Sequence, residues 1–446
     1  AADAGTKSSM ITDENETNVI NDVRVLIFSN VTGDIEVDTS LTTSPGNSMI
    51  TIPIISGSKR ILAIANAGNG MLPAKGSANT YADFSGAIYN ISNTVPVSDP
   101  ATGIDNLSNL VKPAGYVMTN STMSSLISVQ PGVTAADSQD PSSPNHVSID
   151  LQRAVAKVAV SQDADASSLT AFDGSGTLSD LKYSITTVNR SLYLFQNYVN
   201  GALITPEYIP IEYDPVSYYH YYRFYNYHEL LTRNSSPTKG MFIYITENNP
   251  SVKMKGNTTI VAIEAVFKPK KGYFTKDISY NAASGTFTVT LSETDLATAS
   301  DIYRFTGQWV TGLNEGTLLA GVDAGKLARK VTYHLLNPTV PPKASLDDPA
   351  YAAITDSQVA TYFDKYTDGK CYYRVGIGSQ SGSQVDSTVR RNHYYDVVIT
   401  GYRKLGVSQM KMLIEPESGI LLQGGTNITA SFNILEWTGY QVIGPG

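Results

Sequence analysis

Short apolar runs recur along the whole chain, and Gly, Asn, Ser and Pro separate them. Most runs consist of β-branched or aliphatic residues, and several alternate apolar with polar positions, which is the period of a strand with one buried face. In the first half the predicted strands are residues 23–28, 50–54, 61–65, 146–151, 155–160, 181–188 and 192–195. In the second half they are residues 242–245, 259–267, 286–291, 372–375, 394–399, 412–414 and 428–434.

Helical signals are few. Residues 106–110 and 122–126 are weak candidates because Gly and Pro flank both, whereas 318–336 and 357–363 lie in inserts of the second half. Residues 131–144 are rich in Ser, Asp and Pro and predict a long exposed loop. We therefore predict an all-β protein of antiparallel β-sandwiches, with a few short helices confined to inserts.

The length of 446 residues favours two domains. We expect a first domain over residues 1–238 and a second over 239–446, with residues 206–233 as the region between them. That region holds eight tyrosines without a stable period. Tyrosine suits an interface because its ring packs while its hydroxyl stays hydrated, and an aromatic sugar-binding face is the alternative.

Composition narrows the class of protein. Charged residues make up 16% of the chain against about 25% in a typical domain, and the net charge is −8 with the basic residues spread out. Nucleic acid is therefore not an expected partner. One cysteine, Cys371, excludes an intrachain disulfide and is interpreted as a small buried side chain. The chain opens at Ala1 without an export signal, so we expect that such a signal has been removed or lies outside the given sequence.

A search for chemistry finds no catalytic, cofactor or metal motif. The histidines lack zinc-type spacing, and Gln380 occupies the place of the nucleophile within Gly378–Gly382. Asp163 and Asp165 lack the rest of a calcium loop and are interpreted as a solvated turn. A glycosidase-like carboxylate pair needs no sequence signature, so a secreted glycosidase stays open as a distant alternative. We predict a protein that is not an enzyme.

Four motifs follow one another in the order found in the fimbrillins of the Bacteroidales. They are Leu151–Val158 (L-x-R-x-x-A-K-V), Tyr244–Asn248 (Y-x-x-E-N), Tyr372–Val375 (Y-Y-R) and Arg390–Tyr395 (R-N-H-Y-Y). A terminal strand carrying Trp437 fits as well. The chain resembles this family, most closely the shaft subunits of the short, minor fimbriae of Porphyromonas. Before Leu151 the sequence shows only compatible strands.

The resemblance implies two transthyretin-like sandwiches and export as a lipoprotein precursor to the outer membrane. An arginine-specific protease would then remove an N-terminal strand, which makes Ala1 the mature N-terminus. The implied partners are copies of the chain itself in a filament, accessory anchor and tip subunits, and host or bacterial surface ligands.

Strand addition accounts physically for such a polymer. An open sheet edge beside an apolar groove is a template for an added strand, and burying about six side chains gives a gross gain of roughly 10–18 kcal/mol before ordering costs. Donor and acceptor surfaces differ, so the filament is open. The predicted donor residues are Ile428, Phe432, Ile434, Trp437, Tyr440 and Val442. The predicted acceptor-groove residues are Val23, Val25, Ile27, Ile52, Ile54, Ile149 and Leu151.

One alternative concerns this last segment. Residues 428–442 could simply be the last strand of their own sandwich. Alternatively, the earlier residues could remain paired in their own sandwich while the later ones cross to a neighbouring subunit. The leading hypothesis is a structural fimbrial subunit that polymerises by donor-strand exchange after proteolytic maturation and supports adhesion. The alternative is a monomeric surface module that binds glycans or acts as an adhesin.

Overall fold

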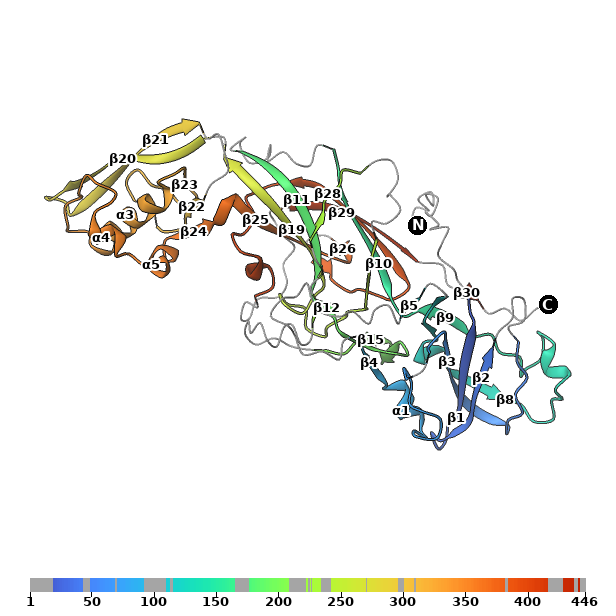
Figure 1. Cartoon of the computed structure of the whole chain (residues 1–446). Coiled ribbons are helices and arrows are strands. Elements are labelled where there is room, and N and C mark those ends of the chain that lie inside the picture. Colours follow the sequence, from blue (N-terminus) through green and yellow to red (C-terminus); the bar gives the residue numbers. More distant parts are fainter. Residues whose placement is uncertain are drawn as a thin grey trace.

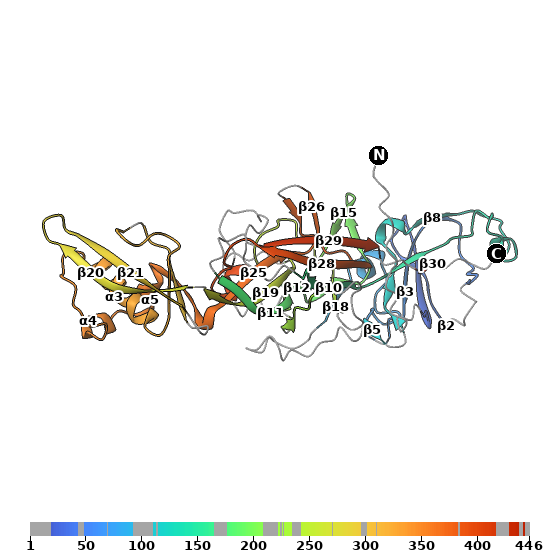
Figure 2. The same cartoon turned by 90° about the horizontal axis from the view of Figure 1, so that it is seen from above.

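The computed structural model describes residues 19–42, 49–68, 70–91, 110–112, 115–164, 176–207, 222–223, 225, 227–233, 242–269, 271–295, 301–308, 310–381, 384–415, 428–436 and 440–441. These residues form three bodies in a row (Figures 1 and 2). We name them the first domain, the second domain and the distal lobe. The distal lobe, residues 271–366, lies at the opposite end of the molecule from the first domain.

The first domain is built on a seven-stranded sheet in the order β2-β1-β3-β7-β9-β30, with β8 also paired to β3. Its strands are β1 (Asp22–Ser29), β2 (Ile35–Thr42), β3 (Gly57–Ala65), β7 (Met118–Thr119), β8 (Leu126–Val129), β9 (Asp150–Arg153) and β30 (Tyr440–Gln441). Smaller elements surround it: α1 (Tyr81–Ser85), β4 (Ile88–Asn90), β5 (Val111–Lys112), β6 (Gly115–Tyr116), β13 (Ser191–Tyr193) and two one-turn helices, η2 (Thr122–Ser124) and η3 (Asp137–Gln139).

The second domain is a sandwich of two four-stranded sheets that share one core. The first sheet contains β18 (Phe242–Ile245), β10 (Ala156–Gln162), β28 (His393–Tyr402) and β29 (Ile428–Glu436), in this order. The second contains β17 (His228–Glu229), β11 (Gly176–Thr186), β19 (Ile260–Pro269) and β25 (Lys370–Gly376). Outside these sheets lie β12 (Val188–Asn189), β14 (Asn197–Val199), β15 (Ala202–Ile204), β16 (Tyr222–Arg223), β26 (Ser379–Ser381), β27 (Gln384–Asp386) and η5 (Met410–Leu413).

The distal lobe interrupts the connection between β19 and β25. Those two strands pair directly, with Val266 opposite Lys370, so the lobe is inserted where a short turn could close the hairpin. Its strands are β20 (Lys271–Asn281), β21 (Thr286–Asp295), β22 (Ile302–Phe305), β23 (Leu318–Ala320) and β24 (Phe363–Tyr366), in the sheet order β21-β20-β23-β22-β24. Its helices are α3 (Ala324–Leu336), α4 (Pro349–Ala352) and α5 (Asp356–Ala360), and η4 (Thr367–Gly369) leads back to β25.

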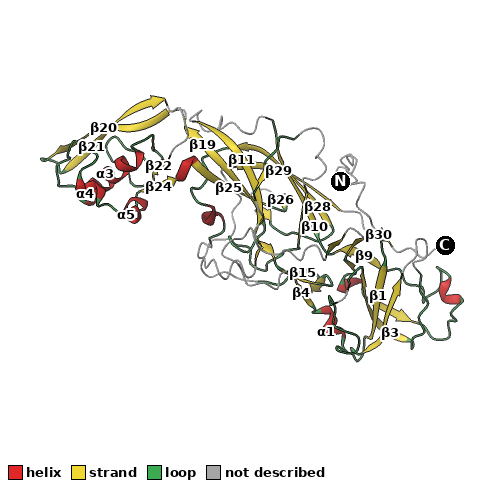
Figure 3. Cartoon of the chain, viewed as in Figure 1, coloured by secondary structure: helices red, strands yellow, loops and turns green. Residues whose placement is uncertain are grey.

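The prediction of an all-β protein with few helices is confirmed (Figure 3). The alternation of buried and less buried side chains accounts for the strands. Along β25, for example, every second residue from Cys371 to Val375 is buried. Cys371 itself is fully buried, as predicted. The helix predicted over 318–336 is confirmed by α3, although residues 318–320 form β23, and the helix predicted over 357–363 corresponds to α5.

Other predictions need correction. Residues 50–54 form no strand, and Pro53, which has no N–H to donate to a ladder, accounts for part of that result. Residues 412–414 lie in and beside η5 rather than in a strand. Residues 122–126 hold only the single turn η2 and the first residue of β8. Most of the other weak helix candidate, 106–110, lies outside the described residues.

The expected boundary between residues 238 and 239 does not coincide with a change of sheet. β10 pairs with β18 and β28, and β11 pairs with β19, so both strands belong to the sandwich of the second domain. The chain then returns: β13 pairs with β4, and Leu192 and Phe195 are fully buried in the core of the first domain. The two domains are therefore linked by several crossings of the chain.

Candidate functional site

One face of the first-domain sheet carries a separate apolar cluster. Side chains on β1 alternate, so Leu26 and Phe28 enter the main core while Val25 and Ile27 point to the opposite face. Val25 and Ile27 are only 7% and 5% exposed, which means that this opposite face is covered. We name it the outer face; its members are Val23, Val25, Ile27, Val37, Ile52, Ile54, Ile61, Ile127 and Ile149.

The cover of the outer face is a segment without strand pairing. Within residues 49–56, Ile52 and Ile54 pack against the cluster, while Thr51, Pro53 and Ile55 are exposed. The segment thus alternates like a strand, but it belongs to no sheet. Side-chain packing, rather than a ladder of hydrogen bonds, holds this cover against the sheet.

The structure brings six of the seven predicted acceptor residues together. Val23, Val25 and Ile27 come from β1, Ile52 and Ile54 from the covering segment, and Ile149 precedes β9. The seventh, Leu151, lies on β9 but is buried in the main core of the first domain instead.

The edge of the same sheet is formed by the end of the chain. β30 pairs antiparallel with β9, with Tyr440 opposite Leu151 and Gln441 opposite Asp150. On its other side β9 pairs with β7, where Met118 lies opposite Arg153. The C-terminal strand therefore occupies a position that would otherwise leave the N–H and C=O groups of β9 open.

The predicted donor residues separate into three groups. Ile428, Phe432 and Ile434 lie in β29, which pairs with β28 along the second domain. Tyr440 lies in β30 on the edge of the first domain. Trp437 and Val442, like the predicted mature N-terminus Ala1, lie outside the described residues.

A buried ion pair of the second domain lies behind this edge, and its arginine also makes hydrogen bonds to the first domain. The guanidinium group of Arg391, just before β28, contacts the carboxylate of Glu247, just after β18, and both side chains are 0% exposed. Arg391 also donates to the carbonyl oxygens of Tyr193 (2.5 Å) and Leu194 (2.8 Å) and to Oγ1 of Thr119 on β7 (3.2 Å). The other carboxylate oxygen of Glu247 accepts from Nε2 of Gln196 at 3.3 Å.

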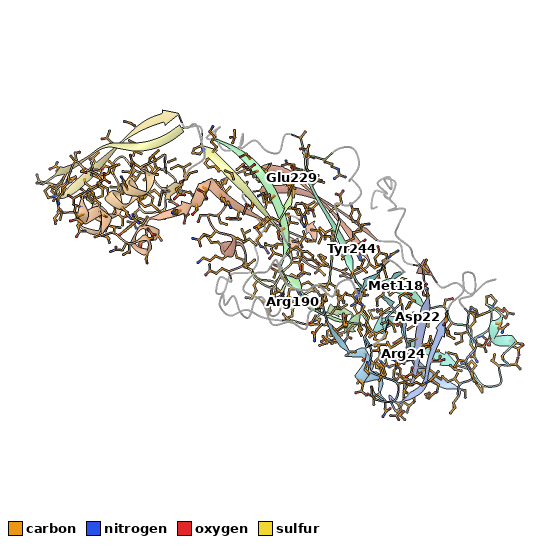
Figure 4. The ribbon with its side chains drawn as sticks, viewed as in Figure 1. Asp22, Arg24, Met118, Arg190, Glu229 and Tyr244 are labelled. Carbon is orange, nitrogen blue, oxygen red and sulfur yellow. The ribbon has the colours of Figure 1, made fainter. Side chains whose placement is uncertain are left out.

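The next residue, Asn392, attaches the same turn to β9. Its φ of 57° lies in the left-handed region, which Asn tolerates better than most residues. Its N–H donates to the carbonyl oxygen of Val155 at 2.8 Å, and its Oδ1 accepts from Nη1 of Arg153 at 3.0 Å. Tyr244 and Tyr116 add a contact between their hydroxyls at 2.9 Å, and Figure 4 shows Tyr244 and Met118 near this junction.

We name the group Thr119, Arg153, Glu247, Arg391 and Asn392 the joint. Three of the motifs recognised in the sequence meet here, because Arg153, Glu247 and Arg391 each belong to a different one. Arg391 and Asn392 form the turn that precedes β28, and these contacts hold that turn in place. No sequence signal indicated that Glu247 is its partner.

A metal or membrane site has no support among the described residues. No group of three or more His, Cys, Asp or Glu side chains within them could hold a metal ion. Within the same part of the chain, no helix has the length and apolar character needed to cross a bilayer.

The fold and the edge thus define a class of protein, a β-sandwich subunit whose own terminal strand completes a sheet. Comparison with protein families names the class. Residues 1–153 match the family of the major fimbrial subunit protein (FimA), and residues 364–442 match that of the major fimbrial subunit protein type IV, fimbrillin, C-terminal. Together these matches cover more than half of the chain. The chain belongs to the fimbrillin family, whose members are structural subunits of fimbriae.

Solved structures show distant similarity over the full length. A protein of Parabacteroides distasonis described as a cell adhesion protein is 12% identical, with a TM-score of 0.46 and coverage of 95% of this chain and 96% of that chain. A fimbrilin (FimA) of Porphyromonas gingivalis is 12% identical, with a TM-score of 0.41 and coverage of 95% and 92%. The tip fimbrial protein Mfa3 of the same species is 14% identical, with a TM-score of 0.38 and coverage of 94% of each chain. No curated protein matches the sequence.

Proposed function

We propose that this chain is a shaft subunit of a cell-surface fimbria and polymerises by exchanging its C-terminal strand between copies. The observation that carries the proposal is the antiparallel pairing of β30 with β9 at the edge of the first-domain sheet. A strand that fits this edge within one chain also fits the same edge of another copy, with the same hydrogen bonds.

The exchange would divide the C-terminal segment at the end of β29. Residues 428–436 would stay paired with β28 in their own second domain. Trp437, Tyr440 and Val442 would then be the donor residues that cross to β9 of the neighbour. Because the donor strand and the acceptor edge are different surfaces, repeated exchange produces an open filament rather than a closed ring.

The outer face supplies an apolar acceptor for such a strand. Val25 and Ile27 are buried beneath Ile52 and Ile54, which no strand pairing holds in place. Displacing this cover would expose the apolar side chains of Val25, Ile27 and Ile61 on one face of the same sheet. Each fully buried aliphatic side chain of a partner would contribute about 1.5–3 kcal/mol there before the ordering cost.

The route to the surface follows from the family and forms part of the proposal. The chain would be exported as a lipoprotein precursor, trimmed by an arginine-specific protease, and held at the outer membrane by anchor subunits. Tip subunits and surface ligands would be its further partners, and adhesion would be a property of the assembled filament.

A deletion tests the proposal. The full chain should form filaments and a ladder that resists sodium dodecyl sulfate, whereas a chain lacking residues 437–446 should give monomers, since it has no strand to donate. The matched control deletes residues 133–142 from the exposed loop, whose base is held by two hydrogen bonds between Gln130 and Asn145 (2.7 and 2.9 Å). Filaments formed by the C-terminal deletion would overturn the proposal. A full chain that stays monomeric after trimming and binds glycans would favour the adhesin module.

A further inference from the structure

We infer that the joint is a positioning device: it fixes the angle between the first and second domains and holds β9 in register for the strand that adds to it. The part of this inference that concerns the filament rests on the proposed function. The part that concerns the two domains does not, because it can be measured on the monomer.

The side chain of Arg391 connects several segments of the chain. Arg391 contacts Thr119 on β7, the backbone at residues 193–194, and Glu247 after β18. Thr119 and residues 193–194 belong to the first domain, while Arg391 and Glu247 flank strands of the second. A single guanidinium group therefore joins both domains from their interior.

The contacts of Arg391 specify a geometry more than they add stability. A buried ion pair is weak evidence for added stability, because desolvation of the two charges offsets most of their attraction. Its hydrogen bonds, in contrast, are directional, and a guanidinium group offers its donors in a rigid planar fork. The arrangement around Arg391 thus favours one relative orientation of the domains over others that would bury a similar apolar area.

The joint is also connected to β9, the strand at the sheet edge to which β30 adds. Asn392 is hydrogen-bonded to Val155 and to Arg153, and Arg153 is the last residue of β9. Leu151, two residues earlier on the same strand, lies opposite Tyr440 of β30. On the other side of the turn, His393 begins β28 and lies opposite Glu436, the last residue of β29.

The turn therefore holds both partners of the exchange. It fixes the strand that accepts the C-terminal residues, and it begins the strand that carries the segment from which those residues emerge. In a filament, the acceptor edge and the donor of each subunit would have a fixed relative position, which sets the angle between consecutive subunits.

The test measures the distance between the domains in the monomer. Nitroxide labels are attached at Val31→Cys, which lies in an exposed turn of the first domain, and at Lys404→Cys, which is exposed on the second domain. Cys371 does not compete for the label, because burial raises the pKa of its thiol to about 12. Double electron–electron resonance should give one narrow distribution for the otherwise unchanged chain.

Two variants address the joint, and one serves as a control. Glu247→Gln removes one charge at nearly constant volume, and Arg391→Lys keeps the charge but loses the planar fork. Both should shift and broaden the distribution. The control Arg24→Met removes a bidentate pair with Asp38 (2.9 Å for each hydrogen bond) inside the first-domain sheet and should leave the distribution narrow.

Three outcomes are decisive for the joint. Broadening in both joint variants, with a narrow control, supports the inference. Folded joint variants that keep the original narrow distribution overturn it, and so does equal broadening in the control.

If the unchanged chain forms no filaments, the proposed function fails while the distance result still stands. If filaments of the joint variants keep the original helical twist by cryo-electron microscopy, the inference about filament geometry is overturned.

Discussion

The second domain is joined to its two neighbours in different ways. On one side, two residues of the second domain make hydrogen bonds to the first domain: Asn392, and Arg391, which also forms a buried ion pair with Glu247 inside the second domain. On the other side, Ile302 and Ala320 of the distal lobe are buried in the apolar core of the second domain itself. Tyr366 also enters this core, and its hydroxyl donates to the carbonyl oxygen of Gly406 at 2.9 Å.

The difference shows that a chain can use one kind of contact to attach a domain and another kind to fix its orientation. Apolar burial is strong but non-directional, so it attaches the distal lobe without specifying many angles. Buried polar contacts add little net stability but penalise every arrangement that leaves them unpaired. The junction on which assembly would depend has polar contacts, and the junction of the inserted lobe is mainly apolar.

The largest expected effect comes from breaking the joint on one side only. Arg391→Met leaves the carboxylate of Glu247 buried without its charge partner and should lower the free energy of unfolding by about 3–5 kcal/mol. The measurement is urea denaturation. The double variant Arg391→Met/Glu247→Leu should recover part of the loss, because no buried charge remains. A loss below about 1 kcal/mol in the single variant would contradict a buried pair.

A smaller effect is expected at the apolar junction. Ile302→Ala removes a fully buried side chain and should cost about 2–4 kcal/mol. Because Ile302 belongs to the distal lobe, faster amide hydrogen exchange should appear across β22 and its neighbours first. The matched control Val322→Ala changes an exposed residue of the same lobe and should have no measurable effect. Equal destabilisation by the two variants would argue against this packing.

A polar contact at the mainly apolar junction should matter less again. Burial raises the pKa of Tyr366 to about 12, so its hydroxyl stays protonated and donates to Gly406. Tyr366→Phe should therefore cost only about 1 kcal/mol, which thermal denaturation can resolve. A loss as large as that of Arg391→Met would remove the contrast between the two junctions.

The smallest expected effect is a pH dependence confined to the distal lobe. His334 on α3 is buried beside Tyr351, with 3.1 Å between Nε2 and the hydroxyl, and burial together with the nearby charge of Lys330 lowers its pKa. The unfolded chain then binds the extra proton more readily, so stability should be full above about pH 6.5 and fall as the pH drops below it.

This dependence can be checked by substitution. His334→Gln should flatten the loss of lobe stability between neutral and acid pH, as followed by hydrogen exchange in α3. His146→Gln, which removes a histidine of the first domain outside the distal lobe, is the matched control. An unaltered acid sensitivity in the first variant would mean that other groups cause it.

Much of the fold could be predicted from the sequence, because alternation is local. β1, β3, β19, β25 and β28 each carry the pattern of a strand with a buried face, and the predicted residues match them. Val23, Val25 and Ile27, which we predicted as acceptor-groove residues, lie together in the outer-face cluster. Residues 50–54 share the pattern but form no strand, since a local pattern does not indicate whether a partner strand is available.

What the sequence could not indicate is long-range pairing. Arg391 and Glu247 are 144 positions apart, and nothing near either residue identifies the other. β10 and β11 were assigned to the first domain because they follow its strands along the chain, although β10 pairs with β18 and β28, and β11 pairs along most of its length with β19. The buried charges of the joint were missed because apolar periodicity, which guides core prediction, does not detect a buried arginine.

The most direct test of the account is to close the edge covalently. Asp150 and Gln441 lie opposite each other in β9 and β30, so Asp150→Cys/Gln441→Cys can form a disulfide between paired strands. The oxidised monomer should be unable to form filaments, and reduction should restore them. If the oxidised chain, with the bond verified as intramolecular, polymerises as fast as the reduced chain, then the C-terminal strand does not cross between copies.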